Sequence, residues 1–86
     1  VFAHNDNMIL GTLDALGASI AGTAPVLVGF DGIREAQRAL REGRLTATIV
    51  QKPEKMGALA VESLARLYRG EKLAPRILVD LEVAER

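Results

Sequence analysis

Three polar residues each follow a short run of apolar residues in this chain: Asn5, Asp31 and Gln51. The side-chain amides of Asn5 and Gln51 both donate and accept hydrogen bonds, whereas the carboxylate of Asp31 only accepts them and can bridge two hydroxyl groups. Planar groups of this kind match the fixed hydroxyls of a sugar ring, and bonds to a charged acceptor are the stronger ones. The set predicts recognition of a small polyol rather than catalysis, because no second carboxylate evidently pairs with Asp31 and no Ser-His-Asp pattern is present.

The apolar runs predict the strands of a sheet. Val26–Phe30 shows no alternation of apolar and polar residues, which indicates a strand covered on both faces, as in parallel sheets. Thr46–Val50 is rich in β-branched residues and is followed closely by Pro53. Val1–Ala3 predicts a short first strand, and Ile77 begins a last one. The last strand comes to alternate between apolar and acidic residues, which indicates one solvated face at an edge.

Helices are expected between these strands, because apolar residues recur there at helical spacing. The three apolar stripes are Ile9, Leu13, Leu16 and Ile20; Ile33, Ala36 and Leu40; and Met56, Ala60, Leu64 and Leu67. The order β-α-β-α-β-α-β predicts an α/β fold with parallel strands and right-handed crossovers. Ligands of such sheets bind beyond the carboxyl ends of the strands, which brings His4–Asp6, Asp31 and Gln51 to one rim.

The composition excludes several classes of function. Eleven basic residues balance 11 acidic ones, so no charge excess favours nucleic acid or an anionic membrane. The absence of cysteine excludes disulfides, and His4 has no second histidine with which to hold a metal. No Gly-x-Gly-x-x-Gly segment follows a strand, as a nucleotide-binding enzyme would require. We therefore expect neither a cofactor nor a metal. The chain also opens on an apolar strand already under way, so we expect a piece of a longer protein.

Four collinear segments resemble the ribose-binding group of periplasmic sugar receptors and, more distantly, the lactose-repressor-type regulators that share their fold. The segments are FAHNDNMILGTLDAL (2–16), VLVGFDGI (26–33), GRLTATIVQKPEKMG (43–57) and GEKLAPRILVDLEV (70–83). The resemblance spans nearly the whole chain. It implies the Rossmann-like, three-layer α/β/α fold of type I periplasmic binding proteins, of which this chain would be the C-terminal part.

The resemblance also implies roles for particular residues. Three residues would hydrogen-bond the sugar: Asn5 in the ND motif, Asp31 in the GFDG motif and Gln51 before the hinge proline. Residues 1–51 would belong to the C-terminal sugar-binding lobe, and residues 52–80 would cross the hinge with a helix associated with the other lobe. Residues 81–86 would form a return strand, with hinge points near Gln51–Lys52 and Asp80–Leu81. The N-terminal lobe would be absent from this chain.

As a function, the resemblance implies a solute-binding protein of an ABC-type importer. It would bind a pentose or related monosaccharide, without catalysis, and present it to a permease. The parent protein would be periplasmic, or extracellular and lipid-anchored. The alternative is the effector-binding domain of a cytoplasmic, lactose-repressor-type regulator. The QKPEKMG motif at residues 51–57 favours the receptor over this alternative. The isolated piece would expose the apolar stripe of its third helix, so we also expect self-association.

Several residues have a second interpretation. His4 stands where ribose receptors tend to carry glutamine, so it is a candidate both for ligand binding and for a structural role. Phe30 is likewise a candidate for stacking on a sugar and for the core. Asn5 or Asp6 fits a helix N-cap, which is compatible with ligand contact by Asn5. Four arginines spaced along the second helix favour a solvated face or, secondarily, a partner contact: Arg34, Arg38, Arg41 and Arg44.

Overall fold

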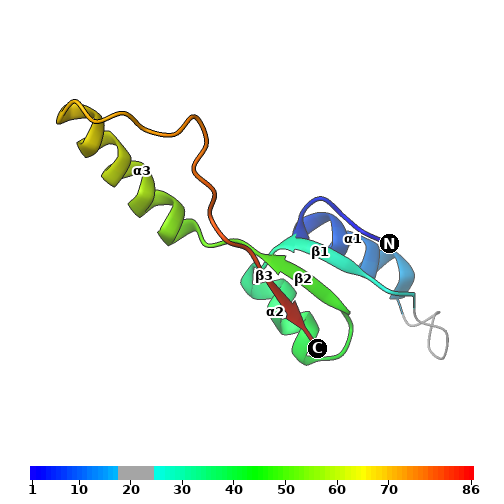
Figure 1. Ribbon diagram of the computed structural model, residues 1–86. Helices are drawn as coiled ribbons and strands as arrows, with labels where there is room; N and C mark the ends of the chain where they lie inside the picture. The colour runs from blue at the N-terminus through cyan, green and yellow to red at the C-terminus, as the bar shows by residue number, and fades with distance from the viewer. Residues whose placement is uncertain (18–24) are drawn as a thin grey trace. The chain divides into compact units, whose positions relative to one another are not determined.

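The computed structural model describes residues 1–17 and 25–86, so the expected helix position Ile20 lies outside the described residues. The elements are α1 (Asp6–Leu16), β1 (Val28–Asp31), α2 (Arg34–Arg41), β2 (Ala47–Val50), α3 (Pro53–Tyr68) and β3 (Glu82–Glu85) (Figure 1). The chain divides into two compact units, Val1–Gln51 with Glu82–Arg86, and Lys52–Leu81. Within the described ranges, no helix is long and apolar enough to cross a bilayer.

The first unit is built on a mixed three-stranded sheet in the order β1-β2-β3. β1 and β2 are parallel, with Asp31 opposite Val50, as the βαβ pattern predicts. β3 is antiparallel to β2, with Glu82 opposite Val50, so the prediction that every strand is parallel is wrong for the last one. β3 lies at the edge of the sheet, as its alternating sequence predicts. The predicted division of its faces is wrong, because Val83 is exposed and Ala84 is the residue that packs against the core.

The second unit explains this reversal. α3 is followed by an irregular segment, and Lys55 Nζ in the first turn of the helix lies 3.8 Å from Oδ2 of Asp80 near the end of that segment. The segment therefore returns along α3 to the place where the chain entered the unit. A chain that re-enters the sheet where β2 finishes must run back antiparallel to β2. The final strand accordingly begins at Glu82 rather than at Ile77 as predicted.

The expected first strand is in the right place but is shorter than predicted. Val1–Ala3 forms a single parallel bridge with β1, between Phe2 and Val28. The N–H of Ala3 donates to the Val28 carbonyl, and the N–H of Val28 donates to the Val1 carbonyl, each at 2.9 Å. One bridge suffices to hold the start of the chain beside β1.

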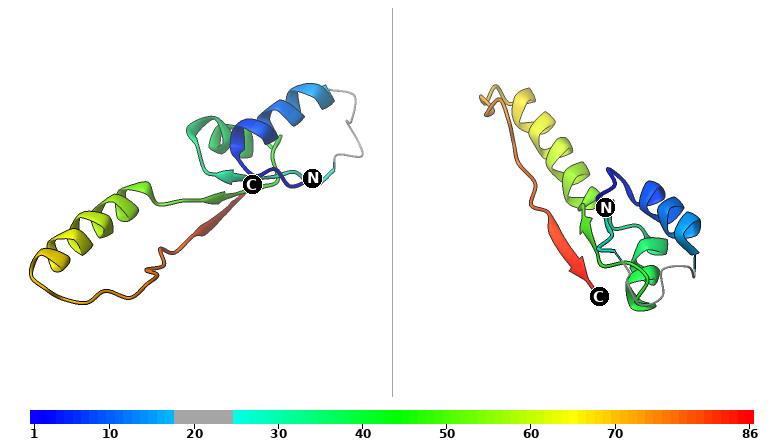
Figure 2. Two further views of the ribbon diagram at one scale, coloured as in Figure 1. Left: turned by 90° about the horizontal axis from the view of Figure 1, so that it is seen from above. Right: turned by 90° about the vertical axis from the view of Figure 1, so that its right-hand side faces the viewer.

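α1 and α2 lie on the same face of this sheet, as both views in Figure 2 show. The core that they share with the sheet consists of Ala3, Ile9, Leu27, Ala36, Ala39, Leu40 and Leu45. Helical spacing correctly predicts Ile9, Ala36 and Leu40 as buried positions. The described residues of this unit supply two of the three expected layers, because both of its helices cover one face.

In the second unit, α3 contains the whole predicted apolar stripe but has no buried residue. Pro53 stands in the first turn, where a missing N–H costs no helical hydrogen bond. The predicted apolar stripe is exposed, with Met56 at 45%, Leu64 at 55% and Leu67 at 53% of their full accessibility. The residues of this stripe therefore pack against few other residues of their own unit.

Candidate functional site

Asp31 and Gln51 meet at the carboxyl ends of β1 and β2. Because these strands are parallel and in register, the N–H of Gln51 donates to the Asp31 carbonyl at 3.0 Å. Their side chains also join, with Nε2 of Gln51 donating to Oδ1 of Asp31. Oδ2 of Asp31 and Oε1 of Gln51 make no hydrogen bond within the described part of the chain. Two hydrogen-bond acceptors are therefore presented together at this rim of the sheet.

The backbone at Asp31 is strained. Its φ is 127°, the only positive φ of a non-glycine residue among those the structure describes. Such a conformation costs about 1–3 kcal/mol and persists only where the surroundings hold it, most often at functional sites. Gly32 continues the turn at φ 80°, and a Cβ at this position would lie 2.9 Å from Cγ2 of Val50. The turn that carries Asp31 thus requires glycine at the following position.

Asn5 holds the start of α1. Its Oδ1 accepts the N–H of Met8 at 2.9 Å, so the predicted N-cap is confirmed at this residue. The amide nitrogen of Asn5 makes no hydrogen bond to any described residue, which leaves it available as a donor. No hydrogen bond joins Asn5 directly to Asp31 or Gln51 within residues 1–17 and 25–86. The link between them is made by the next residue in the chain.

That residue, Asp6, belongs to the framework of the site, although its sequence context predicts only an alternative N-cap. Its side chain is fully buried. Oδ2 accepts the N–H groups of Gly32 at 2.6 Å and Ile33 at 2.8 Å, and Oδ1 accepts the Thr48 hydroxyl at 2.6 Å. These bonds tie the first turn of α1 to the turn after β1 and to β2. One weak sequence signal exists: Gly29 interrupts an apolar strand, and a Cβ there would overlap the Asp6 carboxylate.

The two additional candidates are placed differently. His4 is exposed, and its ring packs edge-on against Phe2 with the centroids 5.7 Å apart. Phe30 is half-buried within β1, opposite Ile49 of β2. A ligand role for either residue stays a prediction. Among the described residues, no cluster of His, Cys, Asp or Glu side chains could hold a metal ion.

The four arginines expected on the second helix are exposed, but Arg44 lies beyond the end of α2 at Arg41. Nε of Arg38 lies 2.9 Å from one carboxylate oxygen of Glu42, and Nε of Arg44 lies 3.0 Å from the other. The hydrogen bond from Arg44, supported by Arg38, holds the pKa of Glu42 below its usual value. Exposed pairs of this kind contribute little to stability. The arrangement is that of a solvated surface at the end of α2.

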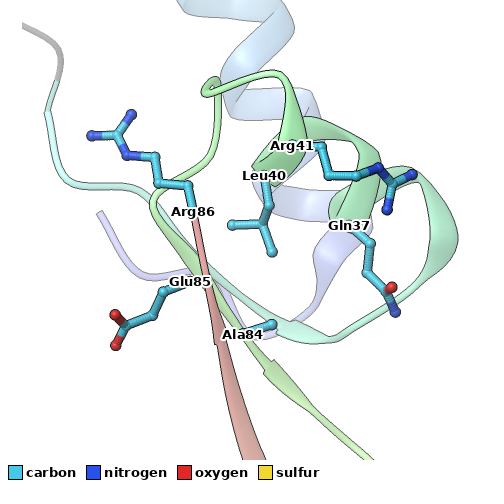
Figure 3. Close-up of a pocket in the computed structure, with 6 residues that line it drawn as sticks. All are labelled: Gln37, Leu40, Arg41, Ala84, Glu85 and Arg86. Carbon is cyan, nitrogen blue, oxygen red and sulfur yellow. The ribbon is translucent and has the colours of Figure 1, made fainter.

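A hollow of about 340 Å³ lies elsewhere in the first unit, between α2 and β3 (Figure 3). Its lining residues are Gln37, Leu40, Arg41, Ala84, Glu85 and Arg86. Glu85 pairs with Ala47 at the beginning of β2, whereas Gln51 follows the end of β2. The hollow is therefore separate from the rim that carries the predicted site residues.

Comparisons with known proteins bear on the whole chain. Residues 1–72 match a family model described as a periplasmic binding protein domain. The ribose import binding protein of Salmonella typhimurium is 45% identical over 84 residues, which are 96% of this chain and 28% of that protein. The corresponding protein of Haemophilus influenzae is 42% identical over 83 residues, again 96% and 28%.

Solved structures agree with this match. An ABC transporter periplasmic solute-binding protein from Actinobacillus succinogenes, with bound D-allose, has a TM-score of 0.84 at 32% identity. The match covers 98% of this chain and 29% of that one. The present chain thus spans little more than a quarter of the length of the curated relatives it matches.

Proposed function

This chain belongs to the periplasmic binding protein family, and from that premise we propose that the intact protein binds a sugar for an ABC-type importer. Its ligand would be a pentose or a related monosaccharide, held and released without chemical change. The observation that carries the proposal is the joined pair of Asp31 and Gln51 where two parallel strands end. Relatives named for ribose import, and a similar structure holding D-allose, support this class of ligand.

Each residue of the proposed site would supply a different kind of hydrogen bond. Oδ2 of Asp31 would accept from sugar hydroxyls, and such charge-assisted bonds are about twice as strong as neutral ones. The amide nitrogen of Asn5 would donate, since its oxygen is occupied by the N-cap. Oε1 of Gln51 would accept, while its nitrogen orients Asp31. Together they would match the alternating donors and acceptors of a polyol ring.

We further propose that residues 1–51 and 81–86 belong to the C-terminal lobe, and that residues 52–80 cross a hinge and associate with the other lobe. The division of the chain after Gln51 and before Glu82 supports this assignment, as does the exposed apolar stripe of α3. Because Gln51 is the last residue before the proposed hinge, closure would reposition the opposite wall of the cleft over the sugar. A membrane permease would then recognise the closed form.

The descriptions of the relatives support a periplasmic location for the parent protein and a permease as its partner. They name import and solute binding, which favours the importer over the effector-binding domain of a regulator. For the isolated 86-residue chain, we propose self-association through the exposed stripe of α3.

Isothermal titration calorimetry of the intact protein with D-ribose and D-allose tests the proposed function. We expect saturable binding of at least one sugar. Asp31→Ala should weaken it roughly 10–100-fold, because each lost bond to a charged group is worth about 1.5–3 kcal/mol. Glu42→Ala, at an exposed position just after α2, is the matched control and should bind as the wild type does. Absence of binding to any monosaccharide, or unchanged affinity after Asp31→Ala, would refute the proposal.

A further inference from the structure

The carboxylate of Asp6 is fully buried, so it is closed to a ligand, yet its bonds converge on the turn that carries Asp31. We propose that Asp6 is a positioning residue for sugar binding, which locks the strained turn and so aims the Asp31 carboxylate. This inference rests on the proposed function, because the ligand contact itself belongs to Asp31. It assigns to Asp6 a role in affinity that is separable from its role in stability.

Asp6 contacts the turn through the backbone N–H groups of that turn. Gly32 and Ile33 contribute the two peptide N–H groups that follow Asp31, and both donate to the same oxygen of Asp6 at 2.6 and 2.8 Å. Asp31 has φ 127° and Gly32 has φ 80°, so the turn departs from the conformations that an unrestrained chain prefers. Two charge-assisted bonds at these distances oppose its relaxation. Without them, Asp31 would move toward negative φ and redirect its side chain.

Asp6 is itself held in place by a hydrogen bond from the sheet. Thr48 is fully buried in β2, and its hydroxyl donates to the other oxygen of Asp6 at 2.6 Å. The carboxylate is thereby fixed to the sheet from which Asp31 and Gln51 project. No buried polar side-chain atom lacks a partner in the described part of the chain, so this network is fully satisfied. Such satisfied networks are rigid and specify one arrangement.

Three variants of the intact protein separate the two roles of Asp6. Asp6→Ala removes both bonds to the turn. Asp6→Asn keeps one oxygen for the N–H groups of Gly32 and Ile33, and its amide nitrogen can donate to Thr48. Thr48→Val keeps the carboxylate and both turn bonds while removing the bond to the sheet.

For D-ribose and D-allose measured by calorimetry, we expect Asp6→Ala to weaken binding at least about tenfold, as expected when Asp31 loses one well-placed bond. Asp6→Asn should weaken binding less than about threefold, which is rescue by the conservative variant. Thr48→Val should lower the unfolding temperature but weaken binding less than Asp6→Ala does, because both bonds from Asp6 to the turn remain. The inference is overturned if affinity simply follows thermal stability across the three variants.

A second measurement needs no ligand. In the sugar-free protein, amide hydrogen exchange at Gly32 and Ile33 should accelerate in Asp6→Ala and stay slow in Asp6→Asn. If the wild type binds no pentose or hexose, the proposed function fails. Unchanged exchange in Asp6→Ala would separately refute the positioning role. Should Asp6→Ala fail to fold, Asp6→Asn decides the matter, because a loss of affinity as large as that of Asp31→Ala contradicts the rescue.

Discussion

Replacing Asp31 by glycine and by alanine should reverse the usual order of stability of these two residues. In the interior of a strand, glycine is less stable than alanine by about 0.5–1 kcal/mol, because it loses more freedom on folding. Asp31 ends β1 at φ 127°, where any residue with a Cβ is strained by about 1–3 kcal/mol. Glycine escapes this strain and alanine does not. The difference predicts that Asp31→Gly is more stable than Asp31→Ala by up to about 2.5 kcal/mol.

The comparison is well controlled, because both variants lose the carboxylate and its bond from Gln51. That loss cancels between them, and only the backbone term remains. Urea unfolding of the intact protein, with the free energy of unfolding extrapolated to water, measures the difference. Both variants should also bind sugar equally poorly, which confirms that the ligand contact is lost in each. If alanine is the more stable variant, the backbone at Asp31 is not strained and the reasoning about the turn is wrong.

Three further outcomes are expected. Asn5→Asp should keep the N-cap to Met8 yet bind sugar more weakly, because it removes the amide donor. Asn5→Ala should bind more weakly and also lower the free energy of unfolding by about 1 kcal/mol, because it removes the cap. If calorimetry shows that Asn5→Asp binds sugar as tightly as the wild type, Asn5 is not part of the site. Because the folded-state pKa of Glu42 is lowered, its stabilising contribution is present above its usual value of 4.5 and is lost as pH falls through the lowered value. An NMR titration should show that the pKa of Glu42 rises toward 4.5 in Arg44→Ala. An unchanged pKa would show that Arg44 does not stabilise the Glu42 carboxylate. Light scattering of the isolated 86-residue chain should show self-association, and Leu64→Lys should reduce it because the lysine places a charge in the exposed apolar stripe of α3. A monodisperse wild-type monomer would contradict self-association through this stripe.

Much of the local structure could be predicted from the sequence, because it depends on local patterns. The spacing of Ile9, Ala36 and Leu40 identified the inward faces of two helices, since a helical period acts within each segment. Pro53, which closely follows β2, stands at the start of α3, where a missing N–H is tolerated. The direction of β3 could not be predicted in the same way. It depends on how residues 52–81 return on themselves, which is a property of a whole unit rather than of a pattern along the strand.

The amino-acid sequence by itself determined which polar residues stand at the ends of strands, and it determined the family. Register then brought Asp31 and Gln51 into contact, as expected of parallel neighbours. Only the tertiary structure decided what holds them there. Asp6 is separated from its three partners by 26, 27 and 42 positions in the chain, so no local pattern reveals its bonds. The physical reason is that a buried carboxylate is satisfied by whichever N–H and O–H groups the fold brings within reach.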